Sequence, residues 1–147
     1  MKTSTVNLFR ILFVVAALWN LLGAAFGYFN TAFTFQNFFG RELTDPLVFE
    51  IYQGAWGTTF VYFFGYLIVA HNPFRHPGIV IVGGIGKLGY AVKLLQLFNA
   101  GLAGPVVLVV ILGDAFFVLT FLYYFFKMHE ANQTIFGSWT ARAEGVA

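Results

Sequence analysis

The chain has 147 residues, of which 59% are hydrophobic and only 10% are charged, whereas a soluble domain carries roughly 25% charged residues. This composition excludes an ordinary water-soluble domain, because its polar residues are too few to cover a surface exposed to water. The net charge of +2 comes from scattered Lys and Arg residues, which argues against a nucleic-acid partner, and the absence of cysteine excludes disulfides and thiolate metal sites.

Four long apolar runs predict helices that cross a membrane. They cover approximately residues 8–28, 48–70, 78–98 and 105–126, and each is close to the ~20 residues that span a ~30 Å hydrocarbon core. A helix is expected for each run, since lipid offers the backbone no other hydrogen-bond partners. The first run is too long for the apolar part of a signal peptide, so we expect it to be retained. The predicted fold is a single all-α integral membrane domain, a bundle of four transmembrane helices.

The segments between these runs differ in character. Residues 29–47 mix several Phe residues with Asn, Gln and Thr, which predicts an outer connector lying in the membrane interface. Residues 71–77 contain two prolines and predict a tight polar turn, and residues 99–104 predict a short uncharged hairpin. Residues 128–147 are too polar to span a membrane and are expected to form a cytoplasmic tail.

The basic residues predict the orientation of the bundle. With four crossings, both termini and the 71–77 turn lie on one side of the membrane. The basic residues expected on that side are Lys2, Arg10, Arg75, Lys127 and Arg142. Only Arg41 is expected opposite, so the positive-inside rule predicts cytoplasmic N- and C-termini in a multi-pass protein of the cell inner (cytoplasmic) membrane.

Two ionisable residues interrupt the apolar runs near their middles. Lys87 lies in the third run and Asp114 in the fourth, at similar sequence distances from the turn near Gly101. The hairpin geometry places them at nearly the same depth, which predicts an ion pair. Either charge alone would cost roughly 2.5–3.5 kcal/mol at the centre of a membrane helix. A structural pair that fixes helix register and a functional pair both remain open at this point.

Other polar residues fall in the outer half of the predicted bundle and indicate a small cavity open to the outside. On the second helix, Glu50 and Gln53 share a face with Gly54 and Gly57. On the third helix, polar residues recur at intervals of three, at positions 87, 90 and 93. Trp19 and Trp56 lie deeper and could stack on a flat ligand, although packing is the commoner role of such residues. The predicted ligand-binding residues are Asn20, Glu50, Gln53, Lys87, Tyr90, Lys93 and Asp114.

No pattern of metal or cofactor ligands is evident in the sequence. His71, His76 and His129 all fall at the expected cytoplasmic boundary, which argues against a haem held between two facing helices. With two methionines and no cysteine, a soft copper site is also unsupported. There is no recognisable set of nucleophile, base and orienting residue, so we expect no cofactor, no metal and no catalytic activity of the chain's own.

Several short motifs occur in a defined order within residues 8–127. They are Trp19-Asn20, Phe39-Gly40, Thr44-Asp45-Pro46, Gly65-Tyr66, Asn72-Pro73-Phe74-Arg75-His76, Gly86-Lys87 and Gly113-Asp114. In this order the chain resembles small bacterial membrane proteins of the DoxX-like type. The better known members of that group are membrane subunits associated with quinol oxidation, thiosulfate oxidation or oxidative-stress complexes. The resemblance implies an inner-membrane setting and a redox partner, and it transfers no catalytic residue.

Two classes of function are consistent with these features. The first is a non-catalytic binding or accessory subunit, whose cavity holds a lipid, a quinone or another small amphiphile, or which docks to a membrane redox complex. The alternative is a transporter or proton-handling protein in which Asp114, Lys87 and Glu50 change protonation. A single four-helix chain has no inverted repeat, so the alternative requires a homo-oligomer.

Overall fold

The computed structural model describes residues 3–131, and this part of the chain is helical with short connecting turns. The helices are α1 (Thr3–Phe29), α2 (Thr31–Phe39), α3 (Pro46–His71), α4 (Pro77–Asn99) and α5 (Val107–Glu130). Three of them, α1, α4 and α5, are long and apolar enough to cross a membrane. The chain therefore has the character of a multi-pass membrane protein.

All four predicted apolar runs form helices, with somewhat different bounds. The helices α1, α3 and α4 extend beyond the predicted limits at both ends, whereas α5 begins two residues later, because residues 105 and 106 belong to the preceding turn. The helix α3 has 26 residues, but no stretch of it reaches the mean hydropathy of the three candidate spans. Four crossings therefore remain a prediction, and most of the predicted cytoplasmic tail, from residue 132 onward, lies outside the described residues.

The predicted interfacial connector contains a helix that the sequence analysis did not anticipate. The helix α2 ends at Gly40, whose φ of 64° is left-handed and suits glycine. Its Phe38 side chain is buried, and the Phe38 carbonyl accepts a hydrogen bond of 2.7 Å from the backbone N–H of Gly104. The contact joins α2 to the turn between α4 and α5, so α2 covers that end of the bundle.

The start of α3 follows from its local sequence. Asp45 precedes the helix, and its carboxylate accepts hydrogen bonds from the backbone N–H groups of Leu47 and Val48. Pro46 occupies the first turn, where a missing backbone N–H costs nothing. These two residues fix where the connector ends and the long helix begins.

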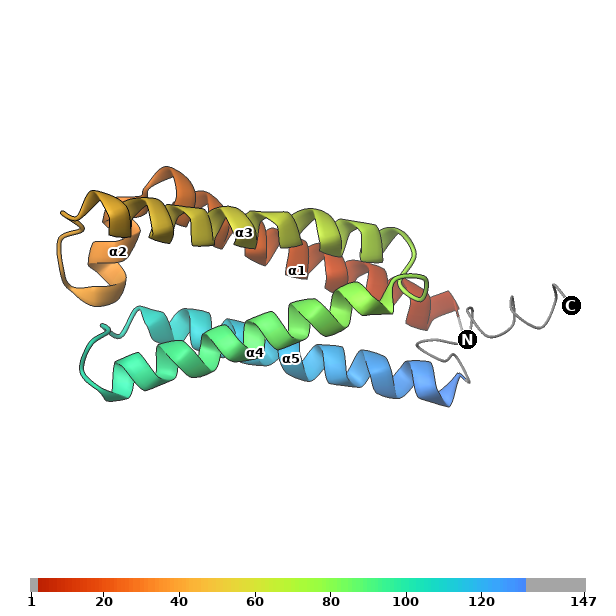
Figure 1. The fold of residues 1–147 in the computed structure, drawn as a ribbon. Coiled ribbons are helices and arrows are strands. Elements are labelled where there is room, and N and C mark those ends of the chain that lie inside the picture. Colours follow the sequence, from red (N-terminus) through yellow and green to blue (C-terminus); the bar gives the residue numbers. More distant parts are fainter. Residues whose placement is uncertain (1–2, 132–147) are drawn as a thin grey trace, which may run out of the picture.

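The long helices form two antiparallel pairs, α1 with α3 and α4 with α5 (Figure 1). The pairs meet near the 72–76 turn, around a core that includes Phe13, Tyr66 and Phe121. A second and smaller core, built on Phe38 and Leu94, lies at the α2 end. In Figure 1 the helices α3 and α4 separate between the turn and the α2 end, and this separation positions the candidate site.

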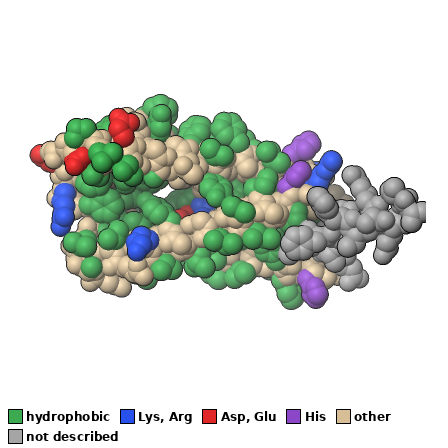
Figure 2. Space-filling model, in the orientation of Figure 1, with side chains coloured by type: hydrophobic (Ala, Val, Ile, Leu, Met, Phe, Trp, Pro, Cys, Tyr) green, Lys and Arg blue, Asp and Glu red, His purple; other side chains and the backbone are tan. Residues whose placement is uncertain are grey.

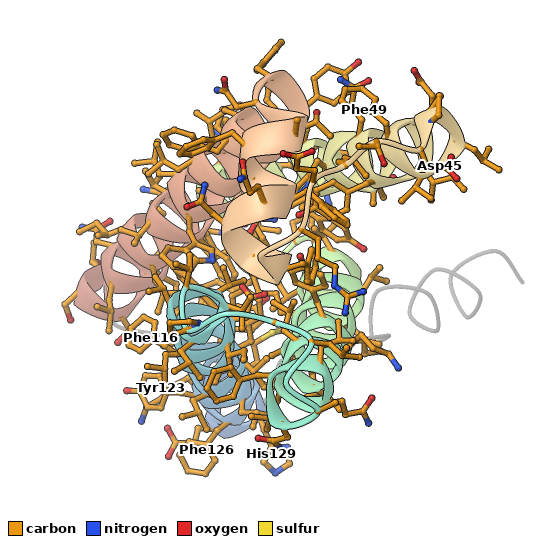
Figure 3. The ribbon with its side chains drawn as sticks, turned by 90° about the vertical axis from the view of Figure 1, so that its left-hand side faces the viewer. Asp45, Phe49, Phe116, Tyr123, Phe126 and His129 are labelled. Atoms are coloured by element: carbon orange, nitrogen blue, oxygen red, sulfur yellow. The ribbon has the colours of Figure 1, made fainter. Side chains whose placement is uncertain are left out.

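The outside of the bundle is apolar. In Figure 3, Phe116, Tyr123 and Phe126 of α5 point away from the other helices. Leu112 on the same helix is 70% exposed, and Val61 on α3 is 65% exposed. Such a surface is unfavourable in water and suits contact with lipid chains.

Candidate functional site

The predicted ion pair between α4 and α5 is confirmed. Lys87 Nζ lies 2.7 Å from Asp114 Oδ1, and both side chains are 7% exposed. Lys87 points inward because it falls on the buried stripe of α4, at helical spacing from Gly83 and Ala91. Asp114 belongs to the corresponding stripe of α5, three residues before the buried Phe117. A charge-assisted hydrogen bond thus connects the two helices of one pair.

Two residues of α1 extend this pair into a network. Asn20 Oδ1 accepts a hydrogen bond of 2.7 Å from Lys87 Nζ, and the indole of Trp19 donates to Asp114 Oδ1 at 3.1 Å. Since α1 belongs to the other helix pair, these two bonds tie the α1–α3 pair to the α4–α5 pair. Among the predicted site residues, Asn20, Lys87 and Asp114 therefore meet directly.

The Lys87 ammonium also faces aromatic rings. Its Nζ atom lies 5.2 Å from the ring centroid of Phe117 and 6.0 Å from that of Tyr66. Both distances fall within the range of cation–π attraction. The ring faces offset part of the cost of holding a cation at this depth in the bundle.

Beside the network lies a cavity of about 440 Å³, within the range of roughly 300–1,000 Å³ that is typical of small-molecule sites. All four long helices contribute to its wall, including Trp19, Tyr52, Trp56, Tyr66 and Tyr90. Figure 2 shows a hollow on the side of the molecule, between the two helix pairs, with acidic and basic atoms at its bottom. The cavity therefore opens sideways, through the gap between α3 and α4.

Glycines bring the wall aromatics close to neighbouring helices. A Cβ atom on Gly27 of α1 would collide with the Trp56 indole, and one on Gly83 of α4 would collide with the Tyr66 hydroxyl. On α5, a Cβ atom on Gly113 would collide with the ring of Trp19. In each case the missing side chain makes room for an aromatic residue of the site.

Three polar atoms of the wall residues lack a partner. The hydroxyls of Tyr52 and Tyr66 and the indole Nε1 of Trp56 are buried and form no hydrogen bond with any described residue. A buried polar group without a partner costs roughly 1–3 kcal/mol. All three residues line the same cavity, so a molecule bound there could satisfy them.

Of the remaining predicted site residues, one lines the cavity and three do not. Tyr90 lines the cavity with the network residues, but Glu50, Gln53 and Lys93 do not. Glu50 is exposed near the start of α3, and Gln53 donates a 3.0 Å hydrogen bond to the Tyr28 carbonyl. Lys93 is exposed and donates to Gln96 Oε1 at 3.1 Å. The structure therefore does not bring these three residues to the cavity, and their role in ligand binding stays a prediction.

The orientation of α3 explains this difference. The helix turns its aromatic face inward, so that Tyr52, Trp56 and Tyr66 line the cavity in place of Glu50 and Gln53. Tyr52 and Tyr66 were missed, although spacings of three and four residues connect Tyr52, Trp56, Thr59, Tyr62 and Tyr66 along one helix face. This repeat of largely aromatic residues was a usable signal in the sequence.

Histidine and carboxylate side chains do not form a metal site within residues 3–131, where no group of three or more His, Asp and Glu residues could hold an ion. His71 and His129 are exposed near the ends of α3 and α5, at the end of the bundle where α1 begins (Figure 2). The chemistry of the cavity therefore rests on hydrogen bonds, one ion pair and aromatic surface.

No protein-family model, curated protein or solved structure matches the chain. The resemblance to DoxX-like proteins thus stays a prediction.

Proposed function

We propose that the protein is a four-span inner-membrane protein that binds a small lipid-soluble amphiphile, as a non-catalytic binding or accessory subunit. The observation that carries the proposal is the cavity between the helix pairs, with three unpartnered polar atoms on its wall residues. A lipid and a quinone are both members of this ligand class, and a membrane redox complex is the partner that a DoxX-like relationship would imply.

A fourth span is supported by the position of α3. This helix lies antiparallel beside α1 along most of its length (Figure 1), and α1 is itself a candidate span. Residues 51–70 of α3 contain no charged side chain. The hydroxyls of Thr58 and Thr59 donate to the carbonyls of Gly54 and Ala55, so the helix satisfies these polar groups itself. The lower hydropathy of α3 is thus compatible with a place in the membrane.

Cytoplasmic termini are supported by the charges at the two ends of the bundle. Arg75 and Lys127 lie at the end where α1 begins and α5 ends, and Glu42 and Asp45 lie near the opposite end (Figure 2). Lys93 lies in the outer half of the bundle, as Arg41 does. The excess of basic residues at the end with the termini is therefore smaller than the sequence alone predicted. Its sign still favours the positive-inside orientation.

The alternative of a proton-handling transporter draws on the buried Lys87–Asp114 pair. It gains less from the structure, because Glu50, the third residue it would use, is exposed and does not line the cavity. A binding role requires only residues that line the cavity.

Native mass spectrometry of the protein released from mild detergent tests the proposal. The wild type should carry a bound amphiphile, and Ala55→Phe should lose it, because Ala55 lines the cavity and a phenyl ring would fill part of it. The control is Val61→Phe on the same helix, since Val61 is 65% exposed on the outer face. Equal retention in the wild type and in both variants, or no adduct in any of them, would contradict the proposal.

A further inference from the structure

The polar atoms around the cavity include more groups that can only donate than groups that can only accept. The Trp56 indole N–H is a donor without a partner, and the Lys87 ammonium has three N–H donors, of which two bind Asn20 and Asp114. The Asn20 side-chain NH₂ makes no hydrogen bond with the described residues, since only its Oδ1 is engaged. A matching ligand must therefore contribute acceptor atoms.

Most hydrogen-bond acceptors of the cavity wall already accept a bond from another residue of the protein. Asp114 Oδ1 accepts from both Lys87 and Trp19, and Asn20 Oδ1 accepts from Lys87. Asp114 Oδ2 is the acceptor-only atom left without a bond among the described residues. The Tyr52 and Tyr66 hydroxyls can each donate or accept, so they do not reverse the balance. Tyr52 and Trp56 lie edge to face with their ring centroids 6.1 Å apart, and neither polar atom has a hydrogen-bond partner among the described residues.

Charge constrains the ligand in a second way. Lys87 and Asp114 are the two charged residues of the lining, and their charges cancel. A cationic ligand would meet the Lys87 ammonium, and an anionic one would meet the Asp114 carboxylate. In a cavity of low polarity either would also lose its hydration, so a neutral molecule is favoured.

The sideways opening indicates the route by which a ligand arrives. The hollow in Figure 2 lies between α3 and α4, on the long side of the bundle and away from its ends. The outer faces of both helices are apolar, with Val61 on α3 at 65% and Ile85 on α4 at 67% exposure. A molecule dissolved in the surrounding lipid could enter without crossing either polar end.

From these observations we infer that the cavity binds a neutral amphiphile whose polar group is a carbonyl, taken up sideways from the lipid phase, with the hydroxyl of Tyr66 or of Tyr52 among its hydrogen-bond donors. The inference rests on the proposed binding function and names its ligand class. A free long-chain ketone or quinone and the ester group of a lipid share this chemistry.

The test compares four probes in lipid nanodiscs, each with the same dibrominated chain, because bromine atoms quench tryptophan fluorescence on contact and so report the binding of every probe equally. The probes are a long-chain methyl ketone, a fatty-acid methyl ester, the matching alkane and a long-chain alkylammonium ion. At least one carbonyl probe should bind more tightly than the alkane and the ammonium ion. Preference for the ketone would indicate a free carbonyl compound as the natural ligand, and preference for the ester would indicate a lipid.

Conservative variants connect this preference to the wall donors. Tyr66→Phe and Tyr52→Phe each remove one hydroxyl, and at least one should lower the carbonyl-over-alkane affinity ratio by about two- to tenfold, the effect of one hydrogen bond. The control Tyr123→Phe removes a hydroxyl from the outer face of α5, where Tyr123 points away from the bundle (Figure 3), and should leave the ratio unchanged. A ratio unaltered in both cavity variants would overturn the inference.

The two proposals fail in different ways. If the alkane or the ammonium ion binds as well as the carbonyl probes, and Ala55→Phe abolishes this binding, the binding function stands and the carbonyl inference is wrong. If no probe binds, or if Ala55→Phe changes nothing, both are wrong. Should Tyr66→Phe not fold, the order of the probe affinities in the wild type and in Ala55→Phe decides the question.

Discussion

Asn20 Oδ1 accepts a 2.7 Å hydrogen bond from Lys87 Nζ, and this bond connects α1 of one helix pair to α4 of the other. Lys87 uses a second N–H to bind Asp114 on α5, so one ammonium group holds three helices together. The network lies beside the cavity, between the core at the 72–76 turn and the smaller core at the α2 end. Its integrity should therefore control both the stability of the bundle and the shape of the site.

The first prediction concerns the Lys87–Asp114 pair. Lys87→Met and Asp114→Leu should each lower the thermal stability in detergent, because loss of one partner of a buried pair costs roughly 3–5 kcal/mol. The double variant Lys87→Met/Asp114→Leu should recover part of this loss, since no unpaired charge remains. Thermal unfolding of the wild type and the three variants is the measurement, and purely additive single effects would show that the pair is not coupled.

The double variant should recover only part of the lost thermal stability. Removing both charges leaves Asn20 Oδ1 and Trp19 Nε1 without their partners. Adding Asn20→Leu to the double variant should restore further stability, because an apolar side chain needs no hydrogen bond. The same Asn20→Leu change in the wild type should be destabilising, since Lys87 would lose an acceptor there. An identical effect in both backgrounds would contradict the network.

A second prediction concerns the contact between Gly27 and Trp56. Gly27→Ala should destabilise the protein, because the new Cβ atom would collide with the base of the Trp56 indole and force α1 and α3 apart. The matched control is Gly54→Ala in α3, where nothing lies within 4 Å of a Cβ atom. The control should be neutral or stabilising by up to about 1 kcal/mol, since alanine favours helix. Thermal stability measures both, and a neutral Gly27→Ala would refute the close approach.

A third prediction concerns the topology, and the absence of cysteine makes it directly measurable. Single cysteines can be introduced as Glu42→Cys before α3, His76→Cys before α4 and Leu102→Cys before α5. With four spans and cytoplasmic termini, a membrane-impermeant maleimide added outside should label positions 42 and 102 and not position 76. Labelling of position 76 together with position 42 would show that α3 does not cross the membrane.

Much of the fold could be predicted because lipid leaves the chain few choices. Apolar runs of suitable length become helices, and the matched positions of Lys87 and Asp114 around one turn predicted their contact. The helix α2 was missed, since alternating Phe and polar residues over nine positions resemble an interfacial loop as well as a helix.

The rotation of α3 was the least predictable part of the site. Its Glu50–Gln53 face and its Tyr52–Trp56 face were both plausible linings; the polar residues favoured the first, whereas the second lines the cavity. Close packing decides between the two faces. The Trp56 indole packs against Gly27, and the Tyr66 hydroxyl packs against Gly83, where a Cβ atom would leave no room. These contacts depend on how three separate helices come together, which local periodicity does not encode.

The central claim, that lipid-soluble molecules enter a cavity between α3 and α4, can be tested by photolabelling in nanodiscs with an uncharged long-chain diazirine, followed by mapping of the labelled residues. The account predicts labels on the cavity residues Trp56 and Tyr62 as well as on the outer residues Val61 and Phe64. In Ala55→Phe the cavity labels should disappear and the outer labels should persist. Labels confined to the outer face of the wild type, or cavity labels that survive Ala55→Phe, would contradict it.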